Sequence, residues 1–457
     1  MTAVIDADYL VVGAGAAGLA FADALVAHSD ARVALVDRRG APGGHWRSAY
    51  PFVRLHQASQ FYGVASRMLG DGGLQKEGPE SGLHSRATGA EVCDYYDGVL
   101  DSLVATGRVE FLGESEFDGE RVRSLVTGEE RAVRPGCRIV DAHHLSPAVP
   151  ADTPPPFVAS EGVTVMPIGR LPQVADAERF VIVGSGKTAT DAIVWLLGRG
   201  TDPGDITWVR PRDPWMLNRA VVQPEPAIFQ GMVADVMDAA ATAGSIDRMF
   251  LDLEHAGVMI RIDAGVTPTM ARTPTLGLWE LDALRTVENV VRRGHLREAG
   301  RGVLRLDDGT VTVPADAVVV HCAADGLPLP ALVPIWAPET ITLQPVRSGF
   351  PCFGAALVGY VEATREGDAA KNALCPPSPY GNTLAEWARM TVLGARASAA
   401  FLADADIRAW ADSVALNPAG VPEGYASAAL DQARARISRA APAGMAALAR
   451  MAGIAAQ

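Results

Sequence analysis

Short apolar stretches, each followed by a glycine-rich turn, divide the chain into blocks. The first block starts with YLVV at residues 9–12, continues with GAGAAG at 13–18, and stays largely apolar as far as residue 27. A second apolar run, RVALV at 32–36, ends at Asp37. Short runs rich in Val are typical of buried strands, and the longer run is typical of a helix. The pattern predicts a strand, a tight turn, a helix over 16–27 and a second strand.

The glycine spacing of this block, G-x-G-x-x-G, has a physical reason. Gly13 permits a tight turn, Gly15 lets the backbone approach a pyrophosphate, and Gly18 lets the helix pack closely on the strand. The free N–H groups at the start of the helix favour a phosphate. Asp37, at the end of the second strand, can accept hydrogen bonds from a ribose. We predict a dinucleotide site that includes Gly13, Gly15, Ala17, Gly18, Asp37 and Arg38.

The same arrangement recurs in the middle of the chain. RFVIV at 179–183 precedes GSGKTA at 184–189, a helix is expected over 190–198, and a strand over 205–209. The Gly-Lys-Thr step is not a P-loop, because that motif requires a glycine where the chain has Val181. The candidate nucleotide contacts of this second block are Gly184, Ser185, Gly186, Lys187, Thr188 and Ala189.

The second strand of this block ends in basic residues instead of an acid. Arg210 and Arg212 stand where Asp37 stands in the first block. An acid there would repel the 2′-phosphate of NADP, whereas arginines pair with it. The sequence therefore favours NADPH over NADH, and NADH stays open.

Two later stretches predict how the blocks are nested. Residues 134–141 and residues 304–320 each resemble a return of the chain to its own sheet, and the second contains the hairpin signal Asp-Asp-Gly-Thr. Five prolines between Pro147 and Pro156 indicate a linker. We predict an α/β fold with two Rossmann-like dinucleotide-binding domains, one inserted in the other. The outer domain is expected to comprise residues 1–150 and 331–457, and the inserted domain residues 151–330.

Helical additions are expected at four places outside these blocks. Residues 231–256 and 278–294 belong to an insertion around the second nucleotide site, where helices could shape a substrate cavity. Residues 383–405 and an alanine-rich stretch at 427–455 follow near the end.

Charge and cysteine content exclude several classes of protein. The net charge of −13 argues against a nucleic-acid-binding surface, which depends on Lys and Arg. The five cysteines are widely spaced and form no C-x-x-C, so no disulfide framework, zinc knuckle or dithiol centre is indicated. His143 and His144 follow Asp141, but adjacent residues on a strand point to opposite faces. We therefore predict no metal site.

The apolar stretch at 9–27 could be taken for a signal peptide or a membrane span. However, no Lys or Arg precedes Arg32, whereas a secretory signal needs a basic start. Asp23 and the glycines do not suit a spanning helix. We predict a cytoplasmic protein without a membrane partner, and a homo-oligomer stays open.

The residues after Asp37 carry a resemblance to a known family. PGGHW at 42–46 and YPF at 50–52 resemble the G-G-x-W segment of the flavin-containing monooxygenases and the Tyr-Pro step of their Baeyer–Villiger relatives. The resemblance implies FAD in the first site. It places Gly44, His45 and Trp46 along the cofactor, and the segment Arg54, Leu55, His56 and Gln57 near the isoalloxazine. It also implies that residues 349–360 form a strand and turn that meet the flavin.

One motif of that family is absent. The fingerprint F-x-G-x-x-x-H should precede the second glycine block, but no histidine lies between His144 and His255. The chain is therefore identified as a divergent member of the class B flavoprotein monooxygenase superfamily.

The resemblance implies an NADPH-dependent monooxygenase. In such enzymes NADPH reduces FAD, and a peroxyflavin formed with O2 passes one oxygen atom to a nitrogen, sulfur or carbonyl carbon of a small molecule. His56 and Gln57 are candidates for tuning the flavin or its oxygen adduct, because a histidine can donate a hydrogen bond; a structural role for His56 is an equal alternative. Two other functions stay open: an NADPH-linked flavin reductase or oxidase without oxygen insertion, and a non-catalytic nucleotide-binding protein. The substrate is not readable, since a fold does not determine it.

Overall fold

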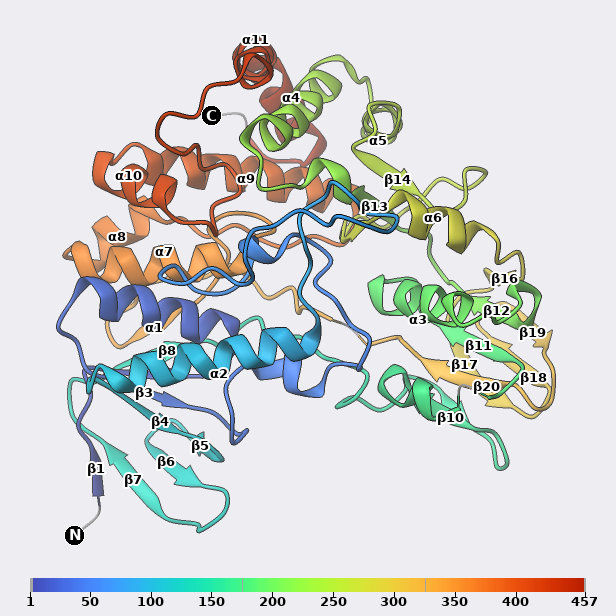
Figure 1. The fold of residues 1–457 in the computed structure, drawn as a ribbon, viewed down its shortest axis with the longest axis horizontal. Coiled ribbons are helices and arrows are strands. Elements are labelled where there is room, and N and C mark those ends of the chain that lie inside the picture. Colours follow the sequence, from blue (N-terminus) through green and yellow to red (C-terminus); the bar gives the residue numbers. More distant parts are fainter. Residues whose placement is uncertain (1–2, 175, 325, 456–457) are drawn as a thin grey trace.

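Two parallel sheets form the frame of the molecule. The computed structural model describes residues 3–174, 176–324 and 326–455. In the first sheet the strands lie in the order β21 (Thr340–Thr342), β8 (Arg138–Asp141), β2 (Tyr9–Val12), β3 (Val33–Val36) and β4 (Val109–Leu112). In the second sheet the order is β10 (Val165–Pro167), β20 (Val318–His321), β11 (Phe180–Val183), β12 (Ile206–Val209) and β16 (Val290–Val291). The two sheets lie on opposite sides of the molecule (Figure 1).

The central strands of both sheets are covered on both faces. All residues of β3, β11, β12 and β20 are buried, which explains why these strands read as continuous apolar runs without alternation. Every ladder in the two sheets is parallel. The carboxyl ends of the strands, where the glycine turns follow, therefore meet at one edge of each sheet.

The second sheet is inserted in the first along the chain. The whole of it lies between β8 and β21, and β21 pairs with β8, with Ile341 opposite Val140. The chain thus leaves the first sheet after β8 and returns to it at β21. The predicted α/β class, with one Rossmann-like domain nested in another, is confirmed. The exact limits of the parts, 150/151 and 330/331, stay predictions.

A helix that covers the first sheet packs face to face against a second helix. α1 (Ala16–His28) is the helix predicted after the first glycine turn, and α7 (Pro351–Thr364) lies along it (Figure 1). A Cβ built on Gly359 would lie 2.4 Å from the carbonyl oxygen of Phe21, so the absence of a side chain there permits the close approach. α2 (Gly89–Ala105) runs beside β4.

The expectation of a strand and turn over 349–360 is wrong, because residues 351–360 belong to α7. Pro351 occupies the first turn of the helix, where its missing N–H costs nothing. Most residues of the helix are buried, so the segment has no polar face that would reveal a helical period. An apolar run of this kind does not distinguish a buried helix from a strand.

The insertion around the second sheet differs from the expected single helices. The helix predicted over 231–256 is two helices, α4 (Pro226–Thr242) and α5 (Ile246–His255). Ser245 caps α5, because its Oγ accepts the backbone N–H of Arg248 at 3.2 Å. The helix predicted over 278–294 ends early: α6 covers Leu278–Arg285, and the chain then extends into β16.

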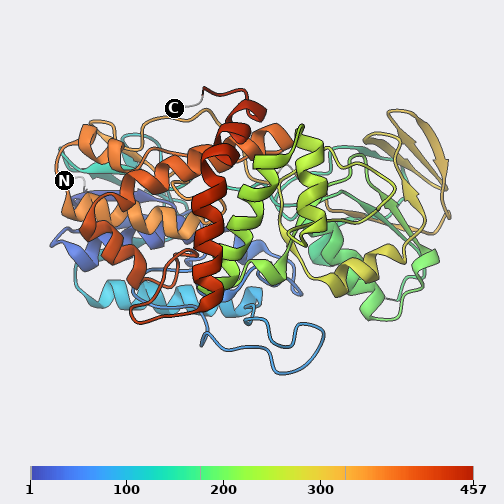
Figure 2. The same ribbon diagram turned by 90° about the horizontal axis from the view of Figure 1, so that it is seen from above.

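Two of the last four helices, α9 (Leu384–Leu402) and α11 (Ala428–Met451), contact the helices of the insertion. α8 (Asp368–Leu374) and α10 (Ala405–Ser413) also follow α7, and α9 and α11 confirm the two predicted C-terminal helices. α11 packs lengthwise against α4 (Figure 2). A Cβ on Gly444 of α11 would lie 2.7 Å from the carbonyl oxygen of Met237, so the two backbones are close. The C-terminal part of the outer domain thus supports the helices inserted between the nucleotide blocks.

Smaller sheets complete the fold. The hairpin predicted at Asp-Asp-Gly-Thr is confirmed as β18 and β19, which pair antiparallel. The strands of the smaller sheets are β1 (Ala3–Ile5), β5 (Ser115–Phe117), β6 (Arg121–Ser124) and β7 (Glu130–Val133); β13 (Trp215–Asn218), β14 (Met259–Arg261) and β15 (Thr275–Leu276); and β9 (Val158–Ala159), β17 (Leu296–Gly300), β18 (Val303–Leu306) and β19 (Gly309–Thr312). Within the described ranges, no helix is long and apolar enough to cross a membrane.

Candidate functional site

The first glycine loop connects β2 to α1 in a form that suits a bound anion. Gly13 has φ +111°, a conformation that L side chains rarely adopt, and its N–H donates to the carbonyl oxygen of Val36 at 2.8 Å. α1 begins directly after Gly15 without a side-chain cap, and its first turn holds no acid. The first N–H groups of the helix are therefore available to a ligand. Ala17 and Gly18 belong to this first turn.

Asp37 stands at the end of β3 and holds the loop from the side. Its Oδ2 accepts the N–H of Ala14 at 2.8 Å, and its Oδ1 accepts the N–H of Arg39 at 2.9 Å. The residue is 5% exposed. Each carboxylate oxygen can accept more than one hydrogen bond, so the position remains suitable for a ribose hydroxyl. Arg38 is exposed beside it, with Nε 3.8 Å from a carboxylate oxygen of Glu116.

A second pair of glycines lies against the first loop. The N–H of Gly43 donates to the carbonyl oxygen of Ala14 at 2.9 Å, and a Cβ built on Gly44 would be 3.1 Å from Cα of Gly15. Both Gly43 and Gly44 have positive φ. The two loops therefore meet backbone to backbone, and a side chain at position 44 would crowd this contact. This contact is consistent with a long cofactor that runs along both loops.

The residues after Gly44 form the short helix η1 (Gly44–Ser48). Trp46 donates from Nε1 to the hydroxyl of Tyr62 at 2.6 Å, and its ring lies 5.3 Å from that of His45 between centroids. Burial, with Arg39 nearby, lowers the pKa of His45 to about 4, so the imidazole is neutral at neutral pH.

The second glycine loop repeats this geometry between β11 and α3 (Lys187–Gly198). Gly184 has φ +140°, and a Cβ there would lie 3.1 Å from the backbone of Cys322. α3 begins after Gly186 without a side-chain cap and without an acid in its first turn. Ser185 and Thr188 are partly exposed at this end, whereas Ala189 is buried in the core. The loop presents backbone N–H groups in the way that a dinucleotide phosphate requires.

Lys187 is held in ion pairs at the start of α3. Its Nζ pairs with Asp191 one turn further along the helix and lies 3.2 Å from Oε1 of Glu280. Asp191 in turn accepts a hydrogen bond from the hydroxyl of Tyr50 at 2.6 Å. The segment that follows the first nucleotide loop therefore contacts the helix that follows the second.

The two arginines after β12 lie in different surroundings. Arg210 is 1% exposed; its Nη2 lies 2.9 Å from Oδ1 of Asp213, and its guanidinium carbon is 4.4 Å from the ring centroid of Trp208. Its Nε and Nη1 have no hydrogen-bond partner in the part of the chain that the structure describes. Burial lowers the pKa of Arg210 to about 10, which leaves it charged at neutral pH. Arg212 is exposed.

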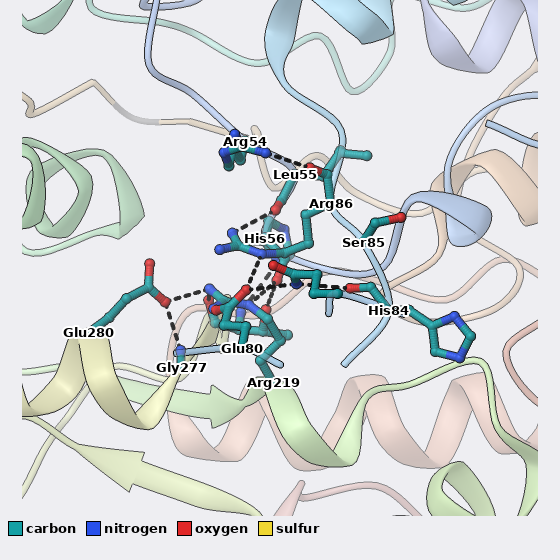
Figure 3. Close-up of polar contacts among 12 residues, drawn as sticks. Arg54, Leu55, His56, Glu80, His84, Ser85, Arg86, Arg219, Gly277 and Glu280 are labelled. Carbon is teal, nitrogen blue, oxygen red and sulfur yellow. Dashed lines mark hydrogen bonds and ion pairs between the residues drawn. The ribbon is translucent and has the colours of Figure 1, made fainter. Parts of the chain in front are cut away.

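His56 lies among side chains of the insertion and of the loop before α2 (Figure 3). The carbonyl oxygen of His56 accepts hydrogen bonds from Nε of Arg219 at 2.9 Å and from the hydroxyl of Thr275. Nδ1 of His56 accepts the backbone N–H of Thr275 at 3.3 Å. Gln57 is 6% exposed, and Leu55, 4% exposed, bonds through its backbone to Ala87.

Buried charges surround His56. Arg219 pairs with both Glu80 and Glu280. Arg86 also pairs with Glu80, and its Nε lies 2.9 Å from Oε2 of that residue. Burial would raise the pKa of Glu280, but Lys187 and Arg219 lower it to about 2. Burial and the cations Lys187, Arg219 and Arg86 lower the pKa of His56 to about 3. The imidazole is therefore neutral while the carboxylates around it are ionised.

Sequence reasoning missed these partners of His56. Glu80 comes from a loop before α2, Arg219 follows β13 at the start of η5 (Arg219–Val221), and Glu280 lies in the first turn of α6. None belongs to a spaced motif, and more than one hundred residues separate Glu80 from Arg219. Arg292, whose Nε lies 2.9 Å from Oδ2 of Asp213, was missed beside Arg210 for the same reason.

The histidines after β8 lie in a turn and not on a strand, contrary to the expectation. β8 ends at Asp141, and the ring of His143 lies against Gly13, where a Cβ would be 2.7 Å from Cδ2. Nδ1 of His144 is 4.0 Å from Oδ2 of Asp141. Over residues 3–174, 176–324 and 326–455, no group of three or more His, Cys, Asp or Glu side chains could hold a metal ion.

One family model matches the part of the chain that holds the first glycine loop. Residues 11–60 match a family model described as an NAD(P)-binding Rossmann-like domain. The chain is similar to a flavin-containing monooxygenase from Stenotrophomonas maltophilia, with 16% identity and a TM-score of 0.43 over 79% of this chain and 98% of that one. It is also similar to the cyclohexanone monooxygenase from Rhodococcus sp. Phi1 bound to NADP+, with 14% identity and a TM-score of 0.47 over 97% and 98%.

A much higher identity links the chain to mycobacterial proteins. It is 40% identical over 417 residues to the uncharacterized protein Rv2000 of Mycobacterium tuberculosis, which covers 90% of this chain and 78% of that protein. The chain therefore belongs to the same protein family as Rv2000.

Proposed function

We propose that this chain is an NADPH-dependent, FAD-containing monooxygenase that oxygenates a small molecule at a nitrogen, a sulfur or a carbonyl carbon. One observation carries the proposal: residues 43–57 connect the two glycine loops. Gly44 at one end contacts Gly15, while Tyr50 bonds to Asp191 of α3. A flavin laid along this segment would extend from the first glycine loop toward the second.

The first loop fits FAD. Gly15 keeps a side chain out of the path of a pyrophosphate, and the uncapped start of α1 offers N–H groups to it. Asp37 and Arg38 would meet the adenosine ribose. The segment that includes Gly44, His45, Trp46 and Leu55 would follow the flavin. FAD, when bound, would accept a hydride and activate O2 for transfer of one oxygen atom.

The second loop fits NADPH. The uncapped start of α3 would receive the pyrophosphate, as in the first block. Arg212 is exposed and can donate to a 2′-phosphate, whereas Arg210 is 1% exposed and pairs with Asp213 behind it. Arg212 therefore favours NADPH over NADH.

His56 supplies a hydrogen-bond donor at the junction. Because its Nδ1 accepts the N–H of Thr275, the neutral ring carries its proton on Nε2. A neutral donor can stabilise negative charge that develops on the flavin or on oxygen beside it, without releasing a proton. Gln57 is buried next to it and would help to exclude water. The cytoplasmic location and a homo-oligomer remain predictions.

The proposal is tested by measuring whether the electrons taken from NADPH appear in hydrogen peroxide or in an oxygenated product. Purified protein loaded with FAD is reduced by NADPH without oxygen, air is admitted, and hydrogen peroxide and oxygenated product are measured with amines, sulfides and ketones. We expect one of these classes to yield product in proportion to the NADPH consumed. If every electron pair appears as peroxide with all three classes, the protein is an oxidase or reductase. If no NADPH is consumed, the protein only binds nucleotides.

A further inference from the structure

Arg219 connects three separate segments of the chain at His56. It is 1% exposed, and its guanidinium donates from Nε to the carbonyl oxygen of His56 at 2.9 Å, from Nη1 to Glu80, and from Nη2 to Oε2 of Glu280 at 2.5 Å. A longer contact joins Nη2 to the carbonyl oxygen of Thr275 at 3.4 Å. Figure 3 shows Arg219 and Glu80 converging below His56. A planar fork with donors on several sides is required for this geometry.

The charges in this cluster balance. Arg86, Lys187 and Arg219 are cations, and the carboxylates of Glu80, Asp191 and Glu280 each contact at least one of them. Charge neutrality alone would be met by any cation at position 219. The contact with the backbone of His56 is therefore the feature that distinguishes an arginine there from a simple counter-ion.

The contacts of His56 determine its orientation and its tautomer. Thr275 holds Nδ1 through its backbone N–H and the carbonyl oxygen through its hydroxyl, while Arg219 holds the same carbonyl oxygen from another side. With Nδ1 acting as an acceptor, Nε2 is the protonated nitrogen of the neutral ring. The charged groups that face the ring are Lys187, Arg219, Arg86 and Glu280.

We propose that Arg219 is a positioning residue: it holds His56 so that the imidazole presents an Nε2–H donor to the flavin. The donor role toward the flavin rests on the proposed function. The tautomer of His56 and the hydrogen bonds by which Arg219 and Thr275 hold it, called the clamp below, do not rest on it. The lowered pKa of His56 agrees with this arrangement, since the ring stays neutral over the physiological range and its hydrogen bonds can then select one tautomer.

Nitrogen NMR of the FAD-loaded full chain with labelled histidine tests the clamp. Comparison with the His56→Gln spectrum assigns the His56 signals. We expect an unprotonated Nδ1 and a protonated Nε2, with no titration between about pH 5 and pH 8. Protonation on Nδ1, or titration in this interval, would overturn the proposal from the wild-type protein alone, even if no Arg219 variant folds.

The substitution Arg219→Lys separates positioning from charge balance. Lysine keeps the positive charge but cannot donate to His56, Glu80 and Glu280 together. We expect the His56 signals to shift to a mixture of tautomers, and kcat to fall about 10- to 100-fold with the KM for NADPH unchanged. Arg248→Lys is the matched control, because Arg248 pairs with Asp252 on the surface of α5, at 2.7 Å and with a side chain 66% exposed.

The outcomes are distinguishable from a failure of the proposed function. If Arg219→Lys folds and leaves the His56 signals as in wild type, Arg219 only balances charge and the proposal is wrong. If the clamp and its loss are observed but no oxygenated product forms with any substrate, the positioning of His56 stands and the monooxygenase assignment fails.

Discussion

At the scale of single residues, the glycines of the first loop differ in what a side chain would meet. A Cβ on Gly18 would lie 1.9 Å from the carbonyl oxygen of Gly13, a distance that no real contact allows. A Cβ on Gly15 would meet only Cα of Gly44 at 3.7 Å, which is ordinary contact. The fold therefore requires glycine at position 18. At position 15 the fold would accept a methyl group, so glycine is required there only if a ligand lies along the loop.

Two alanine variants test this difference. We expect Gly15→Ala to fold with an unfolding midpoint close to wild type but to lose FAD during gel filtration, because its methyl group would occupy the path of the pyrophosphate. Gly18→Ala should be destabilised by about 1–3 kcal/mol or more through overpacking. Urea unfolding and flavin absorbance provide the two readouts. Equal FAD retention by Gly15→Ala and wild type would remove the first loop from the FAD site.

Arg212 provides a test of nucleotide preference. It is exposed after β12, where a 2′-phosphate would lie. A charge-assisted hydrogen bond contributes about 1.5–3 kcal/mol, so Arg212→Ala should raise the KM for NADPH about tenfold or more and leave the KM for NADH unchanged. Arg293→Ala, on the loop after β16, is the control. A parallel rise in both KM values would mean that Arg212 does not recognise the 2′-phosphate.

At the scale of elements, the sequence was informative where local chemistry decides the structure. The strands before each glycine turn and the helices after them follow from short apolar runs and from Gly13 and Gly184, whose positive φ requires glycine. The break between α4 and α5 depends on the cap at Ser245, a signal that was present but overlooked. α7 could not be distinguished from a strand, because tertiary packing buries most of it.

The cluster of charged residues around His56 could not be predicted from the sequence, for a different reason. Its members come from a loop, a turn after β13, β15 and α6, and only the fold brings these elements together. By contrast, Asp37 and the glycine pair Gly43 and Gly44 were predicted from the sequence, because each lies at a set position relative to a strand end. Residue spacing identifies sites built by one supersecondary unit and misses those assembled between two.

The first turn of α6 should contribute measurably to stability. Glu280 pairs with Lys187 of α3 and with Arg219, so Glu280→Ala would leave this buried cluster with one more positive than negative charge. We expect a loss of about 3–5 kcal/mol in the free energy of unfolding. Glu130→Ala removes an exposed pair with Arg121 and should cost no more than about 1 kcal/mol. Comparable losses for the two variants would show that the buried pairing is weak.

The same cluster predicts how stability depends on pH. The pKa of His56 is about 3 in the folded protein and 6.5 ordinarily, so below pH 6.5 the unfolded chain binds a proton that the native state does not. Protonation of His56 in the unfolded chain should therefore lower the free energy of unfolding by about 1.4 kcal/mol for each pH unit between pH 6.5 and about pH 3. Glu280 adds to the loss below pH 4.5, as its own pKa is held near 2.

Substitution of the histidine should flatten this dependence. His56→Gln has no imidazole to protonate, so its stability should fall less steeply than that of wild type between pH 6.5 and the folded pKa near 3. His255→Gln, at the exposed end of α5, serves as the control. Urea unfolding at a series of pH values provides the slopes, and equal slopes for His56→Gln and wild type would contradict the buried neutral state.

At the scale of the whole molecule, the nesting brings two nucleotide loops to one junction. The chain leaves the first sheet after β8, builds the second, and returns at β21, while residues 43–57 stay in contact with both. Hydride transfer requires that a nicotinamide held by the second loop reach a flavin held by the first. From this arrangement we expect NADPH to reduce FAD directly.

Anaerobic reduction tests that expectation most directly. FAD-loaded protein is mixed with NADPH in the absence of oxygen, and the absorbance of oxidised flavin is followed, with NADH in a parallel sample. We predict complete bleaching by NADPH, faster than by NADH at equal concentration, and slower bleaching in Arg212→Ala. If the protein retains FAD but the flavin stays oxidised with both nucleotides, the two loops do not serve one reaction, and the account is wrong.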